Sequence, residues 1–219
     1  VVVVPATLVI LEEGAEATVI EAFTSDTGAE EVVSNAATLM QLGANARLDY
    51  STLQLWGDGV WHFGRHRATL AQDAHLQMFG ASFGGRLQKV YWDALLEGKG
   101  ASASINGLCF ADGTQHFDHQ SLQAHRAPDC QSDLLLKVAA RDHGHSVYSG
   151  LIEVSPVAQR TDGYVQNRNL LLSPGARASS IPRLEISAND VRCSHGTTSG
   201  HIDDEERFYL EARGVTRED

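Results

Sequence analysis

A short repeat is the feature that most constrains how this chain can fold. Each copy starts at a turn-forming position and continues with small or apolar residues at every second position. Copies begin at Gly14, Gly43, Asp73, Gly100, Gly144 and Gly175, at intervals of 29, 30, 27, 44 and 31 residues. Alternation with a period of two is typical of strands with one buried face, and glycine suits a sharp corner between strands.

Strands that recur at nearly constant intervals predict stacked coils, as in a β-helix, where each coil buries its inner face against its neighbours. A β-sandwich with evenly spaced strands would produce the same alternation, and periodicity alone leaves it open. We favour the all-β, β-helix interpretation. The 44-residue interval contains Cys109 to Ala127, and it predicts either a hairpin excursion or an extra half-coil.

Helical signals are confined to the end of the chain. The acidic residues Asp203 to Glu206 begin a segment that ends with Arg213 and Gly214. Acidic residues in the first turn, Arg in the last turn and Gly just beyond it favour a short helix. We therefore expect a β-helix core over residues 1–202 and the start of a C-terminal helical region over residues 203–219. Because the sequence starts without Met and stops in a polar run, we expect flanking domains in a longer protein.

Composition excludes several classes of function. The net charge of −11 and the absence of a basic patch argue against nucleic acid and anionic membranes as partners. The longest apolar run, Val1 to Leu11, is too short for a membrane span. Three cysteines cannot form a closed disulfide framework, which favours a reducing, cytoplasmic setting. No Gly-x-x-x-x-Gly-Lys-Ser/Thr loop occurs, so no nucleotide site is expected in this chain.

The densest group of histidines is His116, His119 and His125, with Asp118 between them. On a strand, residues 116 and 119 point to opposite faces and converge on one metal ion only if a turn intervenes. We expect hydrogen-bonded or surface histidines here. Cys109 and Cys130 are interpreted as small buried side chains.

Cys193 and His195 form a different pattern. On a strand they share a face with Cα atoms about 7 Å apart, so a thiolate and an imidazole can converge on one ion. Soft sulfur and borderline nitrogen ligands suit iron or zinc. Two ligands cannot complete a tetrahedral site, so the others must come from elsewhere in the chain, from a cluster sulfide or from a second protein. Spacing alone leaves open a buried cysteine beside a surface histidine.

The segment around this pair carries a family resemblance. Leu184 to Gly196, with its Cys-Ser-His-Gly run, and the upstream stretch Gln166 to Ser173 resemble the core of the SufB/SufD family of iron–sulfur cluster assembly proteins. Further matching pieces extend over nearly the whole chain. The Cys-Ser-His-Gly form is similar to the SufD branch, because the SufB branch carries a His-Glu pair in the corresponding strand.

The resemblance implies a right-handed parallel β-helix and a scaffold subunit that is not itself an enzyme. It implies that Cys193 and His195 are ligands for transient iron or a nascent iron–sulfur cluster at an interface with SufB. SufB would pair with the C-terminal end of the β-helix, and the ATPase SufC would bind a C-terminal helical domain beyond Asp219. Nothing in the sequence identifies a flavin site.

Two other classes of function stay open at this point. A β-helical polysaccharide lyase or hydrolase predicts carboxylates along one outer face. Aligning the repeats gives no acidic stripe at one outward position, which is occupied by Glu16, Asn45, His75, Ser102, Ser146 and Arg177. The other class is a purely structural dimerisation module with exposed strand edges, and the isolated chain could then form a homodimer.

Overall fold

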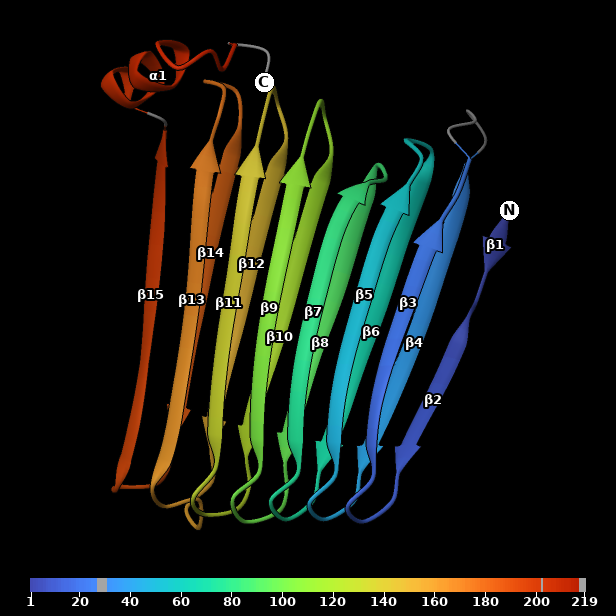
Figure 1. Cartoon of the computed structure of the whole chain (residues 1–219), viewed down its shortest axis with the longest axis vertical. Helices are drawn as coiled ribbons and strands as arrows, with labels where there is room; N and C mark the ends of the chain where they lie inside the picture. Colours follow the sequence, from blue (N-terminus) through green and yellow to red (C-terminus); the bar gives the residue numbers. More distant parts are fainter. Residues whose placement is uncertain (27–30, 202, 217–219) are drawn as a thin grey trace.

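The protein folds into a flattened coil of two parallel β-sheets, seen in a computed structural model that describes residues 1–26, 31–201 and 203–216. One coil consists of one strand from each sheet, and the sheets face each other across the core (Figure 1). The strands are β1 Val2–Val3, β2 Ala6–Leu11, β3 Glu16–Thr24, β4 Val32–Leu42, β5 Arg47–Trp56, β6 Val60–Leu70, β7 His75–Gly84, β8 Leu87–Leu96, β9 Ser102–Ala111, β10 His116–His125, β11 Gln131–Ala140, β12 His145–Val154, β13 Thr161–Leu171, β14 Arg177–Ile186 and β15 Val191–His201.

The odd-numbered strands β3 to β15 form a seven-stranded sheet, and β1, β2 and the even-numbered strands β4 to β14 form the other. In Figure 1 the odd-numbered strands run upward in front, the even-numbered strands β4 to β14 run downward behind them, and successive coils advance from right to left. The coil is therefore right-handed. The predicted right-handed parallel β-helix is confirmed, and the β-sandwich alternative is wrong.

The repeat changes phase in the middle of the chain. Its first four copies precede strands of the seven-stranded sheet, whereas Gly144 and Gly175 precede β12 and β14 in the opposite sheet. The long interval is thus one coil plus a half-coil, and it contains no hairpin excursion. No copy of the repeat begins at the corner before β11. Asp129 occupies this corner, and its positive φ of 64° allows the turn without glycine.

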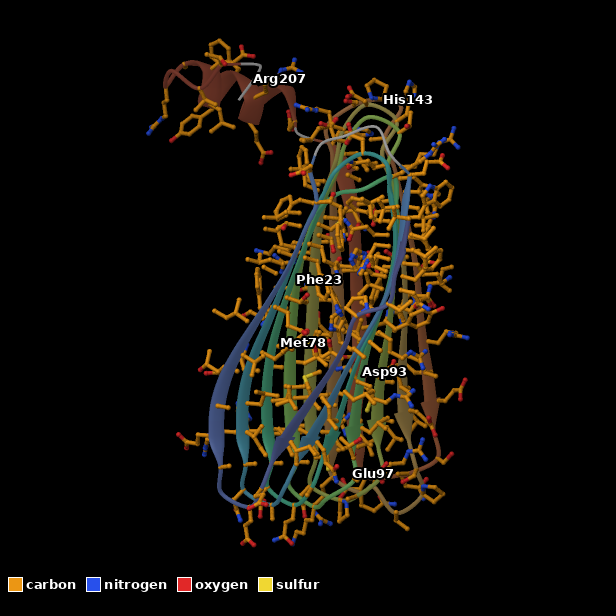
Figure 2. The ribbon with its side chains drawn as sticks, turned by 90° about the vertical axis from the view of Figure 1, so that its right-hand side faces the viewer. Phe23, Met78, Asp93, Glu97, His143 and Arg207 are labelled. Atoms are coloured by element: carbon orange, nitrogen blue, oxygen red, sulfur yellow. The ribbon has the colours of Figure 1, made fainter. Side chains whose placement is uncertain are left out.

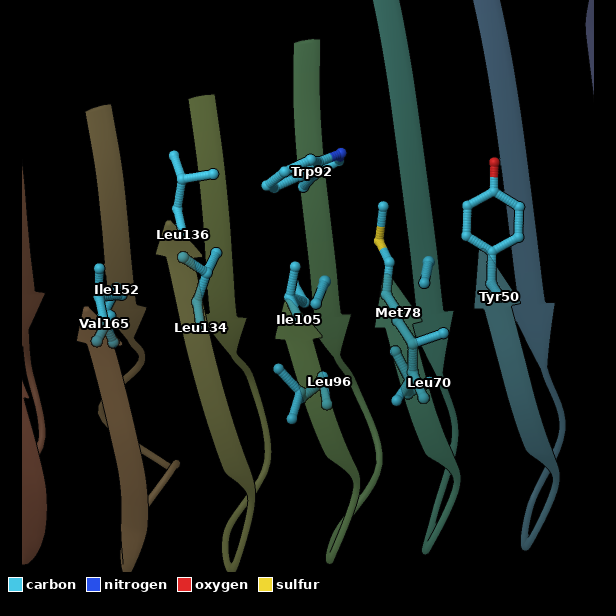
Figure 3. Packing of buried hydrophobic residues seen from close by; sticks show 14 of the residues in the cluster. Tyr50, Leu70, Met78, Trp92, Leu96, Ile105, Leu134, Leu136, Ile152 and Val165 are labelled. Atoms are coloured by element: carbon cyan, nitrogen blue, oxygen red, sulfur yellow. The ribbon is translucent and has the colours of Figure 1, made fainter. Parts of the chain in front are cut away.

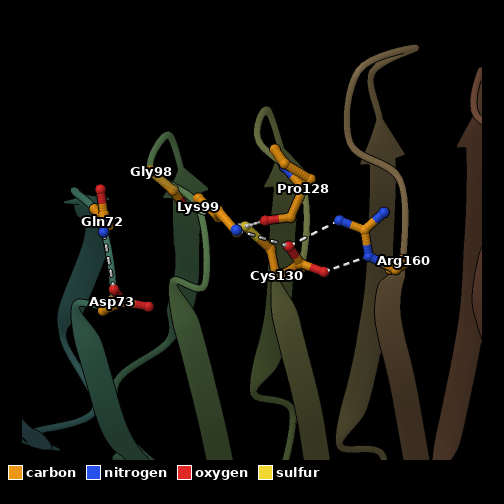
Figure 4. A network of polar contacts seen from close by, with 8 residues as sticks. Gln72, Asp73, Gly98, Lys99, Pro128, Cys130 and Arg160 are labelled. Atoms are coloured by element: carbon orange, nitrogen blue, oxygen red, sulfur yellow. Dashed lines mark hydrogen bonds and ion pairs between the residues drawn. The ribbon is translucent and has the colours of Figure 1, made fainter.

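Corner residues stack from coil to coil and form ion pairs. Arg160 also adopts a positive φ, of 59°, and its guanidinium Nε lies 2.5 Å from Asp129 Oδ1 in the preceding coil (Figure 4). Glycine is required at position 98, because a Cβ there would lie 2.0 Å from the backbone nitrogen of Gln72. The corners therefore combine close backbone stacking with side-chain pairs between neighbouring coils.

The core lies between the two sheets. Inward residues nearest the lower corners are mainly aliphatic, and they include Leu70, Leu96 and Leu134 (Figure 3). The view along the coil axis in Figure 2 shows Phe23 and Met78 inside, with His143 at the upper corners and Glu97 at the lower corners. Burial of these side chains on stacked strands supplies the main stabilising term of the fold.

A short helix, α1 (Asp204–Glu211), follows the last strand and confirms the helical prediction. Asp203 caps it, because its carboxylate accepts a hydrogen bond of 2.9 Å from the backbone N–H of Glu205. Within the described residues, no helix has the length and apolar character needed to span a membrane.

Candidate metal-binding site at the end of the coil

Cys193 and His195 lie on β15, the last strand of the seven-stranded sheet. In the register with β13, Cys193 is opposite Gly163 and His195 is opposite Val165. Gly163 and Val165 are buried and face the coil interior, so the two candidate ligands also point inward. The predicted shared face of the pair is confirmed.

The Cys193 thiol is half-buried against β13. Its Sγ lies 3.4 Å from the position that a Cβ on Gly163 would occupy, so the missing side chain of Gly163 leaves room for it. Burial raises the pKa of the Cys193 thiol, the neighbouring charge of Asp162 raises it further, and the backbone N–H of Gly163 lowers it in part. The thiol is consequently protonated at neutral pH, and a metal must displace its proton in order to bind.

His195 has a different environment although it shares the face of Cys193. Its side chain is exposed, because no described strand follows β15 to cover this level of the interior. The imidazole can therefore be reached from the open end of the coil, while the thiol lies deeper. A ligand that approaches along the coil axis would meet His195 and Cys193 together.

At the open end, apolar residues are exposed whose equivalents in the preceding coil are buried. Leu184 and Ile186 of β14 are 36% and 40% exposed, whereas their register partners Ile152 and Val154 are 0% and 1% exposed. Among the described strands, β14 pairs only with β12 and β15 only with β13, so each has one unpaired edge. Exposed inner-face residues beside two free edges are typical of a protein–protein interface.

A polar clip, made of Asn167, Asn169, Ser180 and Ser199, holds the last strands together above the candidate ligands. The Asn169 amide donates to the backbone oxygen of Thr198 at 3.2 Å and to Ser199 Oγ at 3.1 Å, both on β15. It also contacts Asn167 Oδ1 at 2.9 Å, and Asn167 accepts from Ser180 of β14. The clip therefore connects β13, β14 and β15.

The histidine-rich strand β10 does not assemble a metal site. His119 and His125 are buried inside the coil, where their Nε2 atoms lie 3.1 Å from Ser82 Oγ and 2.8 Å from Ser132 Oγ. His116 and Asp118 face outward, and Asp118 pairs with Lys89 at 2.6 Å. The expected separation onto opposite faces is confirmed. Across the described residues, no group of three or more His, Cys, Asp or Glu side chains is arranged to hold a metal ion.

The other two cysteines are buried free thiols, as predicted. Cys109 lies on the inner face of β9, and burial raises the pKa of its thiol far above the usual range. Cys130 sits at a corner and donates to the backbone oxygen of Gly98 at 3.3 Å. Neither thiol lies on β15, the strand that carries the candidate ligands.

The outward alignment made from the repeat was wrong in register. The position that begins with Glu16 continues through Arg47, His75, Ser102, Gln131, Asp162 and Arg192. Asn45 is a corner residue, Ser146 is buried inside the coil, and Arg177 belongs to the opposite sheet. The corrected row contains no acidic stripe, so it gives no support to a polysaccharide-cleaving groove.

Sequence reasoning did not predict the inward polar side chains, and two groups of them matter most here. One is the clip around Asn169, and the other is Glu21, which shares an inner face with Val19 and Phe23. The signal was available in both strands, because a polar residue occupies a position where the alternation calls for an apolar one.

The sequence of the chain matches known proteins of one family. A family model described as the SufBD core domain of SUF system FeS cluster assembly matches residues 1–219. The chain is 37% identical over 209 residues to the Escherichia coli iron–sulfur cluster assembly protein SufD, which covers 95% of this chain and 49% of that protein. It is 37% identical over 183 residues to a SufBD family protein of Mycobacterium leprae, covering 80% of this chain and 47% of that protein. The chain thus spans about half the length of these curated relatives.

Proposed function

Because the chain belongs to the SufBD core family of the SUF system, we propose that it is a SufD-type scaffold subunit for iron–sulfur cluster assembly. Its cargo is iron or a nascent cluster, and its candidate ligands are Cys193 and His195. The observation that carries the proposal is the position of this pair, on the inner face of the last strand at the open end of the coil.

The chemistry of the pair fits iron. Cys193 supplies a thiolate after losing its proton to solvent or to a basic group of the incoming cargo, and His195 supplies the lone pair of a neutral imidazole. Because two ligands are too few, the coordination is completed by cluster sulfide or by a second subunit. A scaffold role requires no bond cleavage by this chain, and we assign it no enzymatic activity of its own.

The second subunit is SufB in this proposal. The two unpaired edges of β14 and β15, together with the exposed Leu184 and Ile186, provide the surface for a partner at the C-terminal end of the coil. SufC would bind a helical region that α1 introduces. Free thiols at all three cysteines fit a reducing cytoplasm.

Cluster formation in the assembled complex tests the ligand assignment. His195→Ala or Cys193→Ser in the full-length subunit should greatly lower the absorption that develops during anaerobic reconstitution with iron and sulfide, without loss of complex assembly. His201→Ala is a matched control, because His201 is an exposed histidine on the same strand, where its ring nitrogen Nδ1 lies 3.0 Å from the backbone oxygen of Leu171. Normal cluster yield in His195→Ala would reject the assignment.

A second candidate function is a purely structural dimerisation module, favoured by the exposed apolar residues and free edges at the coil end. The two functions differ in the behaviour of the double variant Cys193→Ser/His195→Ala. A structural module keeps both assembly and cluster yield in this variant, whereas a scaffold ligand site keeps assembly alone.

A further inference from the structure

A hydrogen-bonded chain of side chains lies inside the first coils, far from the open C-terminal end. The Glu21 carboxylate accepts hydrogen bonds from Thr7 Oγ1 at 2.6 Å, from Thr38 Oγ1 at 2.7 Å and from the Tyr50 hydroxyl. The Tyr50 hydroxyl oxygen also lies 2.9 Å from His66 Nδ1. Three hydroxyl donors thus satisfy the carboxylate, and the chain continues through Tyr50 to His66.

The proton positions in this chain follow from its donors and acceptors. Because Tyr50 donates its proton to Glu21, its oxygen accepts from His66, and His66 carries its proton on Nδ1. Burial lowers the pKa of His66 to about 4, so the ring is neutral at pH 7. Its Nε2 is therefore a bare acceptor, and it has no hydrogen-bond partner among the described residues.

Two further buried polar side chains face the interior in neighbouring coils, Thr52 from β5 of the seven-stranded sheet and Trp92 from β8 of the sheet that contains His66. Trp92 Nε1 lacks a partner among the described residues, and Thr52 Oγ1 makes no hydrogen bond of regular geometry there, although it is close enough to the Tyr50 hydroxyl to lower the pKa of Tyr50 in part. Thr52, Trp92 and His66 are each 1% exposed. His66 is the register partner of Trp92, and Thr52 is the register partner of Gly80. The Trp92 indole packs on Gly80, with Cε2 only 3.2 Å from the position of a Cβ there. Figure 3 shows the indole nitrogen on the side of the ring that faces Tyr50.

We propose that Thr52, His66 and Trp92 form a binding site for one buried water molecule. The indole N–H of Trp92 donates to the water, the water donates to His66 Nε2, and the Thr52 hydroxyl supplies the third hydrogen bond. Buried waters typically make about three hydrogen bonds to polar groups that would otherwise be unsatisfied. The site combines one obligatory donor, one obligatory acceptor and one group that can be either, which matches water and provides no charge to balance an ion.

The water extends the chain from Glu21 through Tyr50 and His66 to Trp92. It links the first coil, which contains β3, to β8 in the middle of the stack. The interior is consequently hydrogen-bonded along this line.

Water-selective NMR on the full-length protein tests the site. The chain contains three tryptophans, so the indole Hε1 signal of Trp92 can be assigned by Trp92→Phe. We expect a cross-peak between Trp92 Hε1 and a long-lived water, and an Nδ1–H tautomer for His66 in ¹⁵N spectra. Absence of the cross-peak, or a proton on His66 Nε2, would overturn the proposal.

Variants of Thr52 give the second measurement. Thr52→Val should abolish the cross-peak and shift the Trp92 Hε1 resonance, whereas Thr52→Ser retains a hydroxyl and should retain the peak. Thr161→Val is the matched control, because Thr161 is an equally buried hydroxyl that donates to Ala158 O at 2.9 Å near the other end of the coil. An unchanged cross-peak in Thr52→Val contradicts the proposal. If Thr52→Val does not fold, loss of the peak in Thr52→Ser contradicts it instead.

Discussion

Cys193 Sγ lies 3.4 Å from the point where a side chain on Gly163 would begin. The two residues are register partners across β13 and β15, so the depth of the thiol depends on the absence of a side chain at position 163. A side chain larger than that of alanine can be accommodated there only if the thiol or the strand moves.

Gly163→Val should therefore move the Cys193 thiol toward solvent at a stability cost of about 1–3 kcal/mol, because it overpacks a buried position. Alkylation of Cys193 by iodoacetamide in the folded subunit should become faster. Gly163→Ala adds a single methyl group at ordinary contact distance and should have a much smaller effect. Equal alkylation rates in Gly163→Val and the wild type would contradict the packing described here.

The three thiols should react in the order of their exposure. Native-state alkylation followed by mass spectrometry is expected to label Cys193 first, because Cys109 and Cys130 are buried. Burial raises the pKa of all three thiols, so the rate at Cys193 should still rise with pH above neutrality. Labelling of Cys109 at a comparable rate in the folded protein would show that the coil opens more readily than its packing indicates.

The fold was largely predictable from sequence, because alternation and spacing report directly on inward faces and corners. The sheet to which each copy of the repeat belongs was not predictable, because Asp129 occupies one corner in place of a glycine. The next copies, at Gly144 and Gly175, precede strands of the opposite sheet. Backbone conformation at a corner can be met by Asp or Asn as well as Gly, and composition does not reveal which. The missed corner explains the wrong placement of Ser146 and Arg177 in the outward alignment. Asn45 was misplaced because it, and not Gly43, has the positive φ of its corner.

The candidate site was predictable only in part. The shared face of Cys193 and His195 follows from strand geometry, and it holds in the structure. Their unequal exposure depends on which strand ends the stack and on Gly163, a residue thirty positions away in sequence that is adjacent only through parallel pairing. Long-range register of this kind is not encoded in local spacing.

Acid should destabilise the protein through its buried histidines. Burial lowers the pKa of His62, His66, His119 and His125 to about 4, below the unfolded value of about 6.5. The unfolded state therefore binds more protons in this interval, so the stabilisation is complete above pH 6.5 and is lost as the pH falls toward 4. Each histidine contributes up to about 3 kcal/mol to this loss.

Urea unfolding at pH 7.5, 6.5 and 5 measures this effect. The free energy of unfolding should fall slightly between the first two values, because unfolded histidines are half protonated at pH 6.5, and should fall much further at pH 5. His119→Gln should reduce the dependence on pH, because it removes one fully buried titrating group. A free energy that does not change between pH 7.5 and pH 5 would contradict the neutral, buried state of these rings.

The polar clip should control the order of the last strand. Asn169→Ala removes hydrogen bonds to Thr198 and Ser199 and leaves Asn167 and Ser180 with fewer partners, at a cost of about 1–3 kcal/mol. Hydrogen exchange should accelerate in β15 more than in β9, which lies in the middle of the same sheet. Uniform acceleration across both strands would mean that Asn169 stabilises the whole coil rather than its end.

Direct detection of the histidine ligand tests the central claim most sharply. The full-length subunit is labelled with ¹⁵N-histidine, assembled with an unlabelled partner, reconstituted anaerobically and reduced, and the cluster signal is examined by pulsed electron paramagnetic resonance. The account predicts a hyperfine coupling to ¹⁵N that disappears in His195→Ala and persists in His201→Ala. A cluster with no nitrogen coupling from this subunit, or a coupling that survives His195→Ala, would contradict it.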